Sequence, residues 1–251
     1  MWFKKINIVT ILMLFIAAWY SMRLTEFDLA KFKDFKNMID FLGQWFPMDF
    51  SRIETLLYDS LETLAMAFLG TFFGLLIGLP LSFIAARNTA PFKSLYQFSR
   101  VALSFVRSIP EIVFGLILLT TLGLGPFPAV LAIMFHNIGV LGKLISELIE
   151  ASDRGPLEAM KAVGAKNWIA NLFSIIPQIW PNVLSHYFYR FEVAIRTSLI
   201  LGFIGGGGIG QRLFNDFNVF HYSAVSLDVL IIMIMVIIVD FASSYVRNRI
   251  I

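Results

Sequence analysis

The sequence has 251 residues, of which 58% are hydrophobic and 15% charged, with a formal net charge of +3. Soluble domains are about half apolar and a quarter charged, so this composition indicates a chain surrounded mostly by lipid. The small positive balance gives no reason to expect nucleic acid as a partner, and the absence of cysteine excludes disulfides and thiolate metal sites. No polar block is large enough for a soluble domain, so we expect a single membrane domain.

Apolar segments of membrane-spanning length recur along the chain. A helix that crosses the ~30 Å hydrocarbon core needs ~20 mostly apolar residues. We therefore predict an all-α, polytopic membrane protein of about six transmembrane helices. The predicted spans are 6–22, 64–86, 101–122, 129–149, 183–204 and 223–246.

The first apolar segment has two interpretations. Lys4 and Lys5 before an apolar run are also typical of a signal peptide. However, residues 17–22 read Ala-Ala-Trp-Tyr-Ser-Met, which is a poor small-x-small cleavage site. We therefore favour a retained transmembrane anchor over residues 1–23.

Residues 24–60 form a connecting segment with a pattern of its own. Apolar and charged side chains alternate there at helical spacing, which predicts an amphipathic helix in the outer membrane–water interface. A short helix packed on the bundle explains the pattern equally well. The apolar positions are Phe32, Phe35, Ile39, Leu42 and Phe46.

Basic residues indicate orientation through the positive-inside rule. They precede the first span and recur at 87–100, 154–166 and 247–249, and all of these groups fall on one side of a six-span protein. The segment after the first span is the exception, because it carries both basic and acidic residues. We predict that both termini are cytoplasmic and that the uncharged segment 123–128 is extracytoplasmic.

The segment 150–181 is too polar to span the membrane and too long for a simple connection. Pro156 suits the first turn of a helix, and Gly164 suits a left-handed cap at its end. A second helical stretch should follow, and we expect Pro177 and Pro181 to limit it.

This segment resembles the cytoplasmic motif of ABC importer permeases, which reads Glu-Ala-Ala, three residues, Gly, nine residues, then Ile-x-Leu-Pro. The matching residues are Glu158, Ala159, Gly164 and Pro177, and the departures are Met160, Ser174 and Ile176. In that family the loop forms coupling helices that seat in a groove of the ATPase subunit. The resemblance therefore implies an ATPase-coupling role for the matching residues, with an ordinary helical hairpin as the alternative.

Further segments are similar to the permease subunits of bacterial ABC-type phosphonate importers. They are 78–88, 107–111, 136–143, 189–196 and 201–210, and the resemblance covers roughly residues 60–212. It implies a type I ABC importer permease architecture over 61–251, with the coupling loop at 150–181. It also implies a permease subunit that passes a phosphonate or a related phosphorus oxyanion inward. A permease for another small solute, such as an amino acid, is the alternative.

The same resemblance implies the partners and the location. They are a cytoplasmic ABC ATPase in two copies, an extracytoplasmic substrate-binding protein and a second copy of this chain, in the bacterial inner membrane. The sequence contains no G-x-x-x-x-G-K-[ST] phosphate loop. We therefore expect a transport subunit rather than an enzyme, with no cofactor of its own and with ATP bound by the partner.

Two motifs are expected to be misleading. Gly205, Gly207 and Gly210 satisfy G-x-G-x-x-G, but a dinucleotide fingerprint must follow a strand in a βαβ unit. Here the motif ends a predicted span, so we expect a flexible break that lines a cavity. The three histidines are scattered and form no ligand pair, which argues against a metal site.

Charged side chains inside the fifth span are candidates for the substrate pathway, because such groups normally face a polar interior. Arg190 lies ~10 Å and Arg196 ~20 Å beyond the start of the span at 1.5 Å per residue. Glu192 and Arg196 are four residues apart and are expected to neutralise each other. Arg190 has no such partner in its own helix. Since a guanidinium suits a tetrahedral oxyanion, we expect Arg190, and secondarily Arg196, to line the path.

His136 and Asn137, in the fourth span, are further pathway candidates. A hydrogen-bonded packing role is an equal alternative for His136. Glu111, which follows Pro110, either helps to gate the path or caps a kinked helix, and we favour the second interpretation. A membrane-embedded enzyme would need clustered carboxylates or histidine pairs at bilayer depth, and a passive channel would need no coupling motif.

Overall fold

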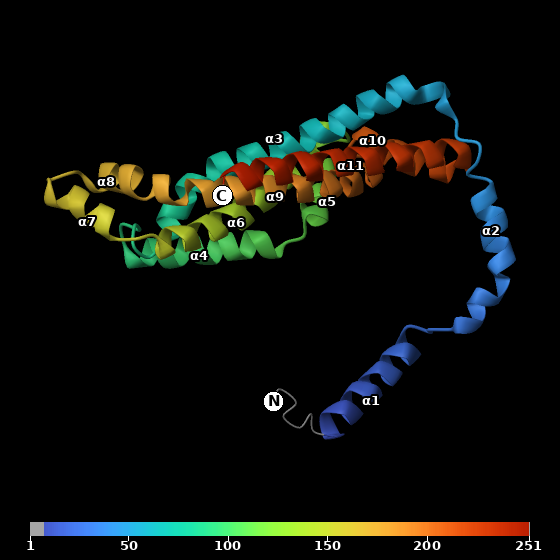
Figure 1. The fold of residues 1–251 in the computed structure, drawn as a ribbon, viewed down its shortest axis with the longest axis horizontal. Coiled ribbons are helices and arrows are strands. Elements are labelled where there is room, and N and C mark those ends of the chain that lie inside the picture. The colour runs from blue at the N-terminus through green and yellow to red at the C-terminus, as the bar shows by residue number, and fades with distance from the viewer. Residues whose placement is uncertain (1–7, 251) are drawn as a thin grey trace. The chain divides into compact units, whose positions relative to one another are not determined.

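The computed structural model describes residues 8–250, and this part of the chain is helical without any strand. Lys4 and Lys5, which entered the predicted orientation, lie outside the described residues. The chain forms two units, Met1–Gln44 and Trp45–Ile251, each considered by itself. Figure 1 labels their helices.

The first unit contains α1 (Ile8–Leu24), the 3-10 helix η1 (Leu29–Asp34) and α2 (Phe35–Gly43). With 17 residues, α1 lies at the short limit for a membrane span. The amphipathic helix predicted after it is shorter than expected. Asp28 caps η1 by accepting the Ala30 N–H at 2.8 Å, and Phe46 lies beyond the end of α2. The side chain of Phe32 is not among the described ones.

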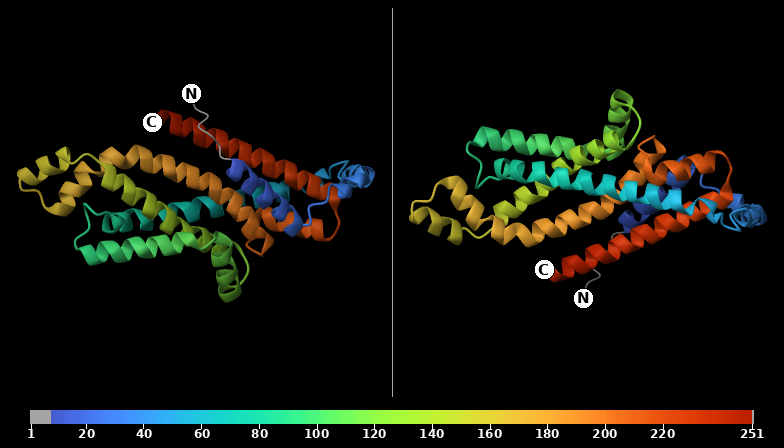
Figure 2. Two further views of the ribbon diagram at one scale, coloured as in Figure 1. Left: turned by 90° about the horizontal axis from the view of Figure 1, so that it is seen from below. Right: turned by 90° about the horizontal axis from the view of Figure 1, so that it is seen from above.

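The second unit is a bundle of long helices with two broken pairs. Its elements are η2 (Phe50–Arg52), α3 (Ile53–Ala85), α4 (Lys93–Ser108), α5 (Glu111–Leu122), α6 (Pro126–Ala151), α7 (Gly155–Ala162), α8 (Asn167–Ser174), α9 (Ile176–Phe203), α10 (Gly208–Asn218) and α11 (Tyr222–Ile250). Helices α3, α6, α9 and α11 run beside one another in both figures (Figures 1 and 2).

Length and composition confirm several membrane spans. Within the described residues, the α3, α6 and α11 segments are long and apolar enough to cross a membrane, and up to five spans result if each broken pair, α4–α5 and α9–α10, counts as one. The shorter apolar helix Thr10–Leu24, in the first unit, falls below the length of these spans, so the expected sixth span stays a prediction. Both α3 and α9 begin earlier than predicted, at Ile53 and Ile176.

The third predicted span, 101–122, is wrong as a continuous helix. Helix α4 ends at Ser108, and α5 leaves it at an angle of 83°, which is visible in Figure 2. Pro110 lacks an N–H and disfavours a helical conformation in the residue before it, and Ile109 is accordingly extended with ψ 122°. The kink lies beside Glu111 as expected, but Glu111 does not cap α5, because the cap residue is Pro110 and no side chain caps the helix.

The expectation that Pro181 limits the second short helix is also wrong. Pro177 begins the first turn of α9 and so limits α8 as expected, whereas Pro181 lies inside α9. The helix continues through Pro181 because neighbouring groups in a bundle can satisfy the backbone carbonyl that a proline frees.

A seam of glycines joins α3 to α6 and fixes their distance. A Cβ at Gly70 would lie 2.6 Å from Ile133 Cγ2, and a Cβ at Gly74 would lie 2.6 Å from Asn137 Cβ. Small residues four apart are the usual means of close helix contact in membranes, where burial from water supplies no driving force. The seam therefore places Asn137 directly against α3.

Candidate functional site

Arg190, on α9, lies in a polar cluster inside the bundle. It is only 8% exposed. Its Nε donates to Asn137 Oδ1 at 2.8 Å, and its Nη2 donates to Glu111 Oε1 at 3.0 Å. A buried guanidinium needs both a counter-charge and hydrogen-bond acceptors. The arginine without a partner in its own helix thus obtains them from α6 and α5.

Asn137 and His136 connect the cluster to the rest of the bundle. Asn137 is fully buried, and its Nδ2 donates to Thr71 Oγ1 at 3.2 Å. His136 Nδ1 lies 2.9 Å from the Ile109 carbonyl oxygen, and because a carbonyl only accepts, Nδ1 is the donor. His136 Nε2 lies 3.3 Å from Glu111 Oε1. The cluster therefore joins α3, α5, α6 and α9.

The break before α5 supplies two groups of this cluster. A helix end leaves carbonyl groups without intrahelical partners, and His136 binds such a carbonyl at Ile109. Glu111 faces Arg190 from the first turn of α5. A cavity of about 270 Å³ adjoins Glu111, lined by Pro110, Glu111, Ile112, Thr197, Ile200 and Leu201.

Glu192 and Arg196 do not neutralise each other, so that expectation is wrong. Glu192 Oε1 lies 2.9 Å from Arg247 Nη1, and Arg196 Nη2 donates to Asp240 Oδ2 at 3.0 Å. Both partners lie on α11, which packs beside α9 and offers closer counter-charges than the next turn of the same helix. The Arg196–Asp240 pair is about half exposed, at 52% and 43% of the side-chain surfaces.

Of the predicted pathway residues, the structure brings Arg190, His136 and Asn137 together and places Glu192 and Arg196 in separate ion pairs. Sequence reasoning missed Thr71 and Asp240 altogether. Asp240 carried a usable signal, since it is a charge inside the sixth predicted span. Thr71 carried none, because its role depends on the contact with Asn137.

The glycine motif forms the expected break, between α9 and α10. Gly205 and Gly207 have φ of +98° and +87°, a region that favours glycine. The Gly208 N–H donates to Glu62 Oε2 at 2.9 Å, and the Ile209 N–H donates to Thr63 Oγ1 at 3.0 Å. Side chains of α3 therefore occupy the N-terminus of α10, where a phosphate would otherwise bind.

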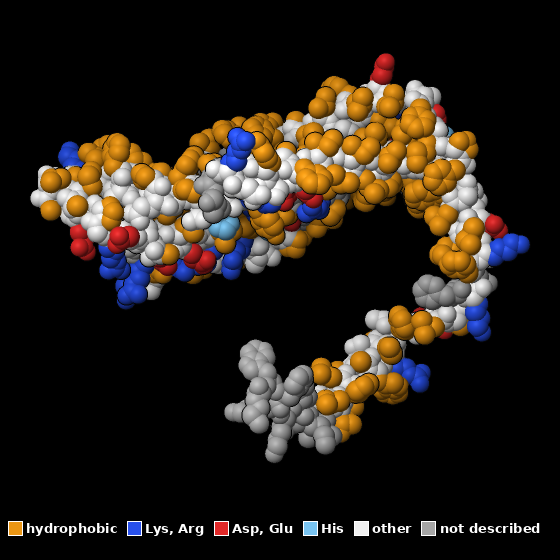
Figure 3. All heavy atoms as spheres, in the orientation of Figure 1, with side chains coloured by type: hydrophobic (Ala, Val, Ile, Leu, Met, Phe, Trp, Pro, Cys, Tyr) orange, Lys and Arg blue, Asp and Glu red, His pale blue; other side chains and the backbone are white. Residues whose placement is uncertain are grey.

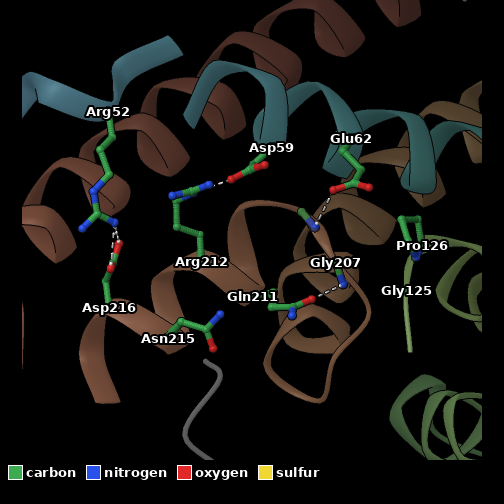
Figure 4. Close-up of a pocket in the computed structure, with 11 residues that line it drawn as sticks. Arg52, Asp59, Glu62, Gly125, Pro126, Gly207, Gln211, Arg212, Asn215 and Asp216 are labelled. Carbon is green, nitrogen blue, oxygen red and sulfur yellow. Dashed lines mark hydrogen bonds and ion pairs between the residues drawn. The ribbon is translucent and has the colours of Figure 1, made fainter. Parts of the chain in front are cut away.

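A second polar cluster surrounds this break and is drawn in Figure 4. It lines a cavity of about 480 Å³. Arg212 pairs with Asp59, and Arg52 Nη1 donates to Asp216 Oδ1 at 3.2 Å. Each arginine here has a carboxylate of its own, and Glu62 is engaged by the backbone of α10.

The segment between α6 and α9 forms the two predicted short helices, and the predicted glycine cap is confirmed. Gly164 has φ +82°. Its N–H donates to the Lys161 carbonyl at 3.0 Å, and the Ala165 N–H donates to the Met160 carbonyl at 3.1 Å. This pair of bonds is the Schellman motif that closes a helix.

Exposed apolar side chains surround this cap. Glu158, Ala159, Gly164 and Pro177 are exposed. Val163 is 82% exposed, Trp168 66% and Phe173 65%, and Figure 3 shows hydrophobic side chains at this end of the bundle among charged ones. Exposed apolar groups in an otherwise polar segment are typical of a protein-binding surface.

Comparisons with known proteins find relatives of this chain among the permease proteins of transport systems. A family model described as "Binding-protein-dependent transport system inner membrane component" matches residues 78–251. The putative phosphite transport system permease protein HtxC of Stutzerimonas stutzeri is 36% identical over 95% of this chain and 84% of its own length. The phosphite transport system permease protein PtxC of the same organism is 34% identical over 99% of this chain and 90% of its own. The phosphate-import permease protein PhnE of Mycolicibacterium smegmatis is 39% identical over 61% of this chain and 29% of its own.

Solved structures of ABC transporters share the fold. An inward-facing MetNI methionine ABC transporter chain superposes with a TM-score of 0.71, at 21% identity, over 81% of this chain and 100% of that one. A chain of a bacterial ABC transporter involved in alginate import gives a TM-score of 0.67, at 13% identity, over 94% and 95%. At these identities the likeness shows the fold alone.

Proposed function

The chain belongs to the family of binding-protein-dependent transport system inner membrane components, and we propose that it is the permease subunit of an ATP-driven importer that carries phosphite, a phosphonate or a related phosphorus oxyanion inward. It is a multi-pass membrane protein with the fold of ABC importer permeases. The observation that carries the proposed substrate class is the sequence identity of 34–36% with two phosphite transport permeases, over 95–99% of this chain.

The proposed substrate pathway passes the Arg190 cluster. Arg190 is a planar donor suited to a tetrahedral oxyanion, and Asn137 fixes its orientation. His136 and Glu111 lie beside it. A cavity adjoins Glu111 but is not lined by Arg190, so an anion would approach Arg190 from the side of Glu111. Glu111 lies at the break before α5, and Asn137 lies at the tight α3–α6 seam, so both groups that bind Arg190 are held at fixed points of the backbone.

The half-exposed pair Arg196–Asp240 supports a second copy of this chain as a partner. Charged side chains are costly against hydrocarbon, yet both groups are open on the surface of the single subunit. In our proposal, this face of α9 and α11 borders the path between two copies, with Glu192 and Arg247 just behind it.

Helices α7 and α8 are the proposed docking surface for a cytoplasmic ATPase subunit. In the proposed assembly, two ATPase subunits bind ATP and each docks on one of two permease chains. The exposed Val163, Trp168 and Phe173 supply apolar contacts, and Glu158 a charge. An extracytoplasmic binding protein would deliver the substrate, and this chain would bind no cofactor itself. Both termini would then be cytoplasmic.

The substrate proposal is tested by reconstituting the chain with its ATPase and binding protein in vesicles. We expect ATP-dependent accumulation of labelled phosphite or methylphosphonate. Methionine uptake without uptake of either phosphorus anion would instead support the alternative of an amino acid importer and overturn the proposal.

The docking proposal is tested with Gly164→Asp. At φ +82° an aspartate costs of order 1–3 kcal/mol of local strain, yet no atom lies within 4 Å of the position, so insertion into the membrane should persist. We expect the variant to be uncoupled, so that the rate of ATP hydrolysis no longer depends on substrate transport. Normal transport by this variant would show that the loop is not the docking element.

A further inference from the structure

Glu111 occupies the position in which an anion would bind Arg190. Its Oε1 accepts from Arg190 Nη2 at 3.0 Å, the geometry in which a guanidinium also binds a phosphoryl oxygen. Its own Oε2 accepts a hydrogen bond from none of the described residues. The carboxylate is thus held by one oxygen only and is 22% exposed beside the cavity.

Arg190 has donors left with which an incoming anion can make its first contact before Glu111 is displaced. A guanidinium carries five N–H donors, and the contacts within residues 8–250 use Nε towards Asn137 and Nη2 towards Glu111. Nη1 donates to no described residue, and it is not among the fully buried polar atoms that lack a partner. The arginine is therefore fixed through Nε while its outer edge remains available.

An incoming oxyanion would exchange with Glu111 rather than join an empty site. Leaving a buried charge unpaired costs several kcal/mol, so Arg190 keeps a counter-ion before, during and after passage. A bidentate oxyanion offers Arg190 two hydrogen bonds where Glu111 offers one. The displaced carboxylate remains next to His136, whose Nε2 is 3.3 Å away, and it can return when the anion leaves.

We propose that Glu111 is an internal competitor for the oxyanion at Arg190 and that this competition keeps the binding weak enough for release. Passage requires a site that an ion can enter and also leave. This inference rests on the proposed function, because it assumes that an oxyanion reaches Arg190. It assigns Glu111 as the residue that sets the affinity of that step.

The test uses the full chain with its ATPase subunit in lipid nanodiscs, without binding protein, and measures equilibrium binding of radiolabelled methylphosphonate. Glu111→Gln removes the competing charge and keeps the size, so the variant should bind the anion about tenfold tighter or more, because a hydrogen bond between charged groups no longer has to be broken first. In vesicles the same variant should take up methylphosphonate more slowly, because release becomes limiting. A merely structural role would not raise binding while lowering uptake.

The matched control is Glu54→Gln, which removes a carboxylate exposed in the first turn of α3 and should change neither quantity. Should Glu111→Gln fail to reach normal membrane abundance, Glu111→Asp replaces it, because the shorter side chain also withdraws the competing carboxylate and should tighten binding.

Three outcomes separate this inference from the proposed function. Tighter binding in either Glu111 variant, abolished by adding Arg190→Gln, supports both. Loss of binding in Arg190→Gln without tightening in the Glu111 variants overturns the competition and leaves the anion path intact. Binding that is unchanged in Arg190→Gln overturns both assignments of Arg190.

Discussion

The two polar clusters of this chain neutralise their arginines in different ways. In the Arg190 cluster, one carboxylate oxygen of Glu111 serves both Arg190 and His136, and a fully buried amide fixes the guanidinium. In the cluster of Figure 4, Arg52 and Arg212 each have a carboxylate of their own beside an open cavity. In the first arrangement, two donors share one carboxylate oxygen in a largely buried place, whereas in the second each arginine has its own carboxylate beside a cavity. A lost partner should therefore cost far more in the first cluster than in the second.

The largest effect is expected for Arg190→Leu. Removing one partner of a buried pair leaves an uncompensated charge, so we expect a loss of about 3–5 kcal/mol in the free energy of unfolding. Arg190→Leu combined with Glu111→Leu should recover most of it, because apolar replacement of a whole buried pair is often neutral. Denaturant titration of the purified chain in detergent measures both. Equal stability of the single and double variants would contradict the contrast drawn above.

The next effect is expected for Gly74→Ala. The new Cβ would lie 2.6 Å from Asn137 Cβ, and overpacking of this kind costs about 1–3 kcal/mol. Because Asn137 orients Arg190, oxyanion uptake should fall as well. Gly43→Ala is the matched control, since nothing lies within 4 Å of Gly43. Full uptake and full stability in Gly74→Ala would show that the seam does not position the Arg190 cluster.

A smaller effect is expected in the second cluster for Glu62→Ala. Glu62 accepts the Gly208 N–H at the start of α10, so its loss should cost about 1 kcal/mol, as for other N-terminal caps. Thermal unfolding of the purified protein checks this, with Glu54→Ala, at the exposed first turn of α3, as the reference. A cost as large as that of Arg190→Leu would remove the distinction between the clusters.

The smallest effect is expected for Arg52→Lys. The Arg52 side chain is 42% exposed, whereas its partner Asp216 is only 9% exposed and needs a counter-charge. Because lysine keeps the positive charge in this half-exposed pair, the cost should stay below about 1 kcal/mol. The same denaturant titration serves as the measurement, and a cost above that of Glu62→Ala would argue against this account.

The sequence predicted the helices well wherever a local pattern determined them. The centres of α3, α6, α9 and α11 followed from apolar length, and the cap at Gly164 followed from a single glycine after a short helix. The broken third span was missed even though Pro110 was noticed, because a proline reveals that a helix is disturbed and not by what angle it turns.

The candidate site was only half predictable. Arg190, His136 and Asn137 stood out as polar groups inside spans, but their partners lie far away in the chain. Glu111 is 79 residues from Arg190, and Asn137 is 53. The one pairing that sequence spacing did suggest, Glu192 with Arg196, was overruled by Arg247 and Asp240 on α11. Contacts between helices decide such pairings, and spacing along one helix does not report them.

The separation of Glu111 from Arg190 along the chain also has a consequence for biosynthesis. Translation proceeds at about 5–20 residues per second, so the 79 residues between them correspond to about 4–16 s during which Glu111 has been made and its arginine has not. Because a carboxylate is costly against hydrocarbon, we expect the start of α5 to stay in contact with water or protein over that interval. The 83° corner at Pro110 should reach its final geometry only after α9 has supplied Arg190.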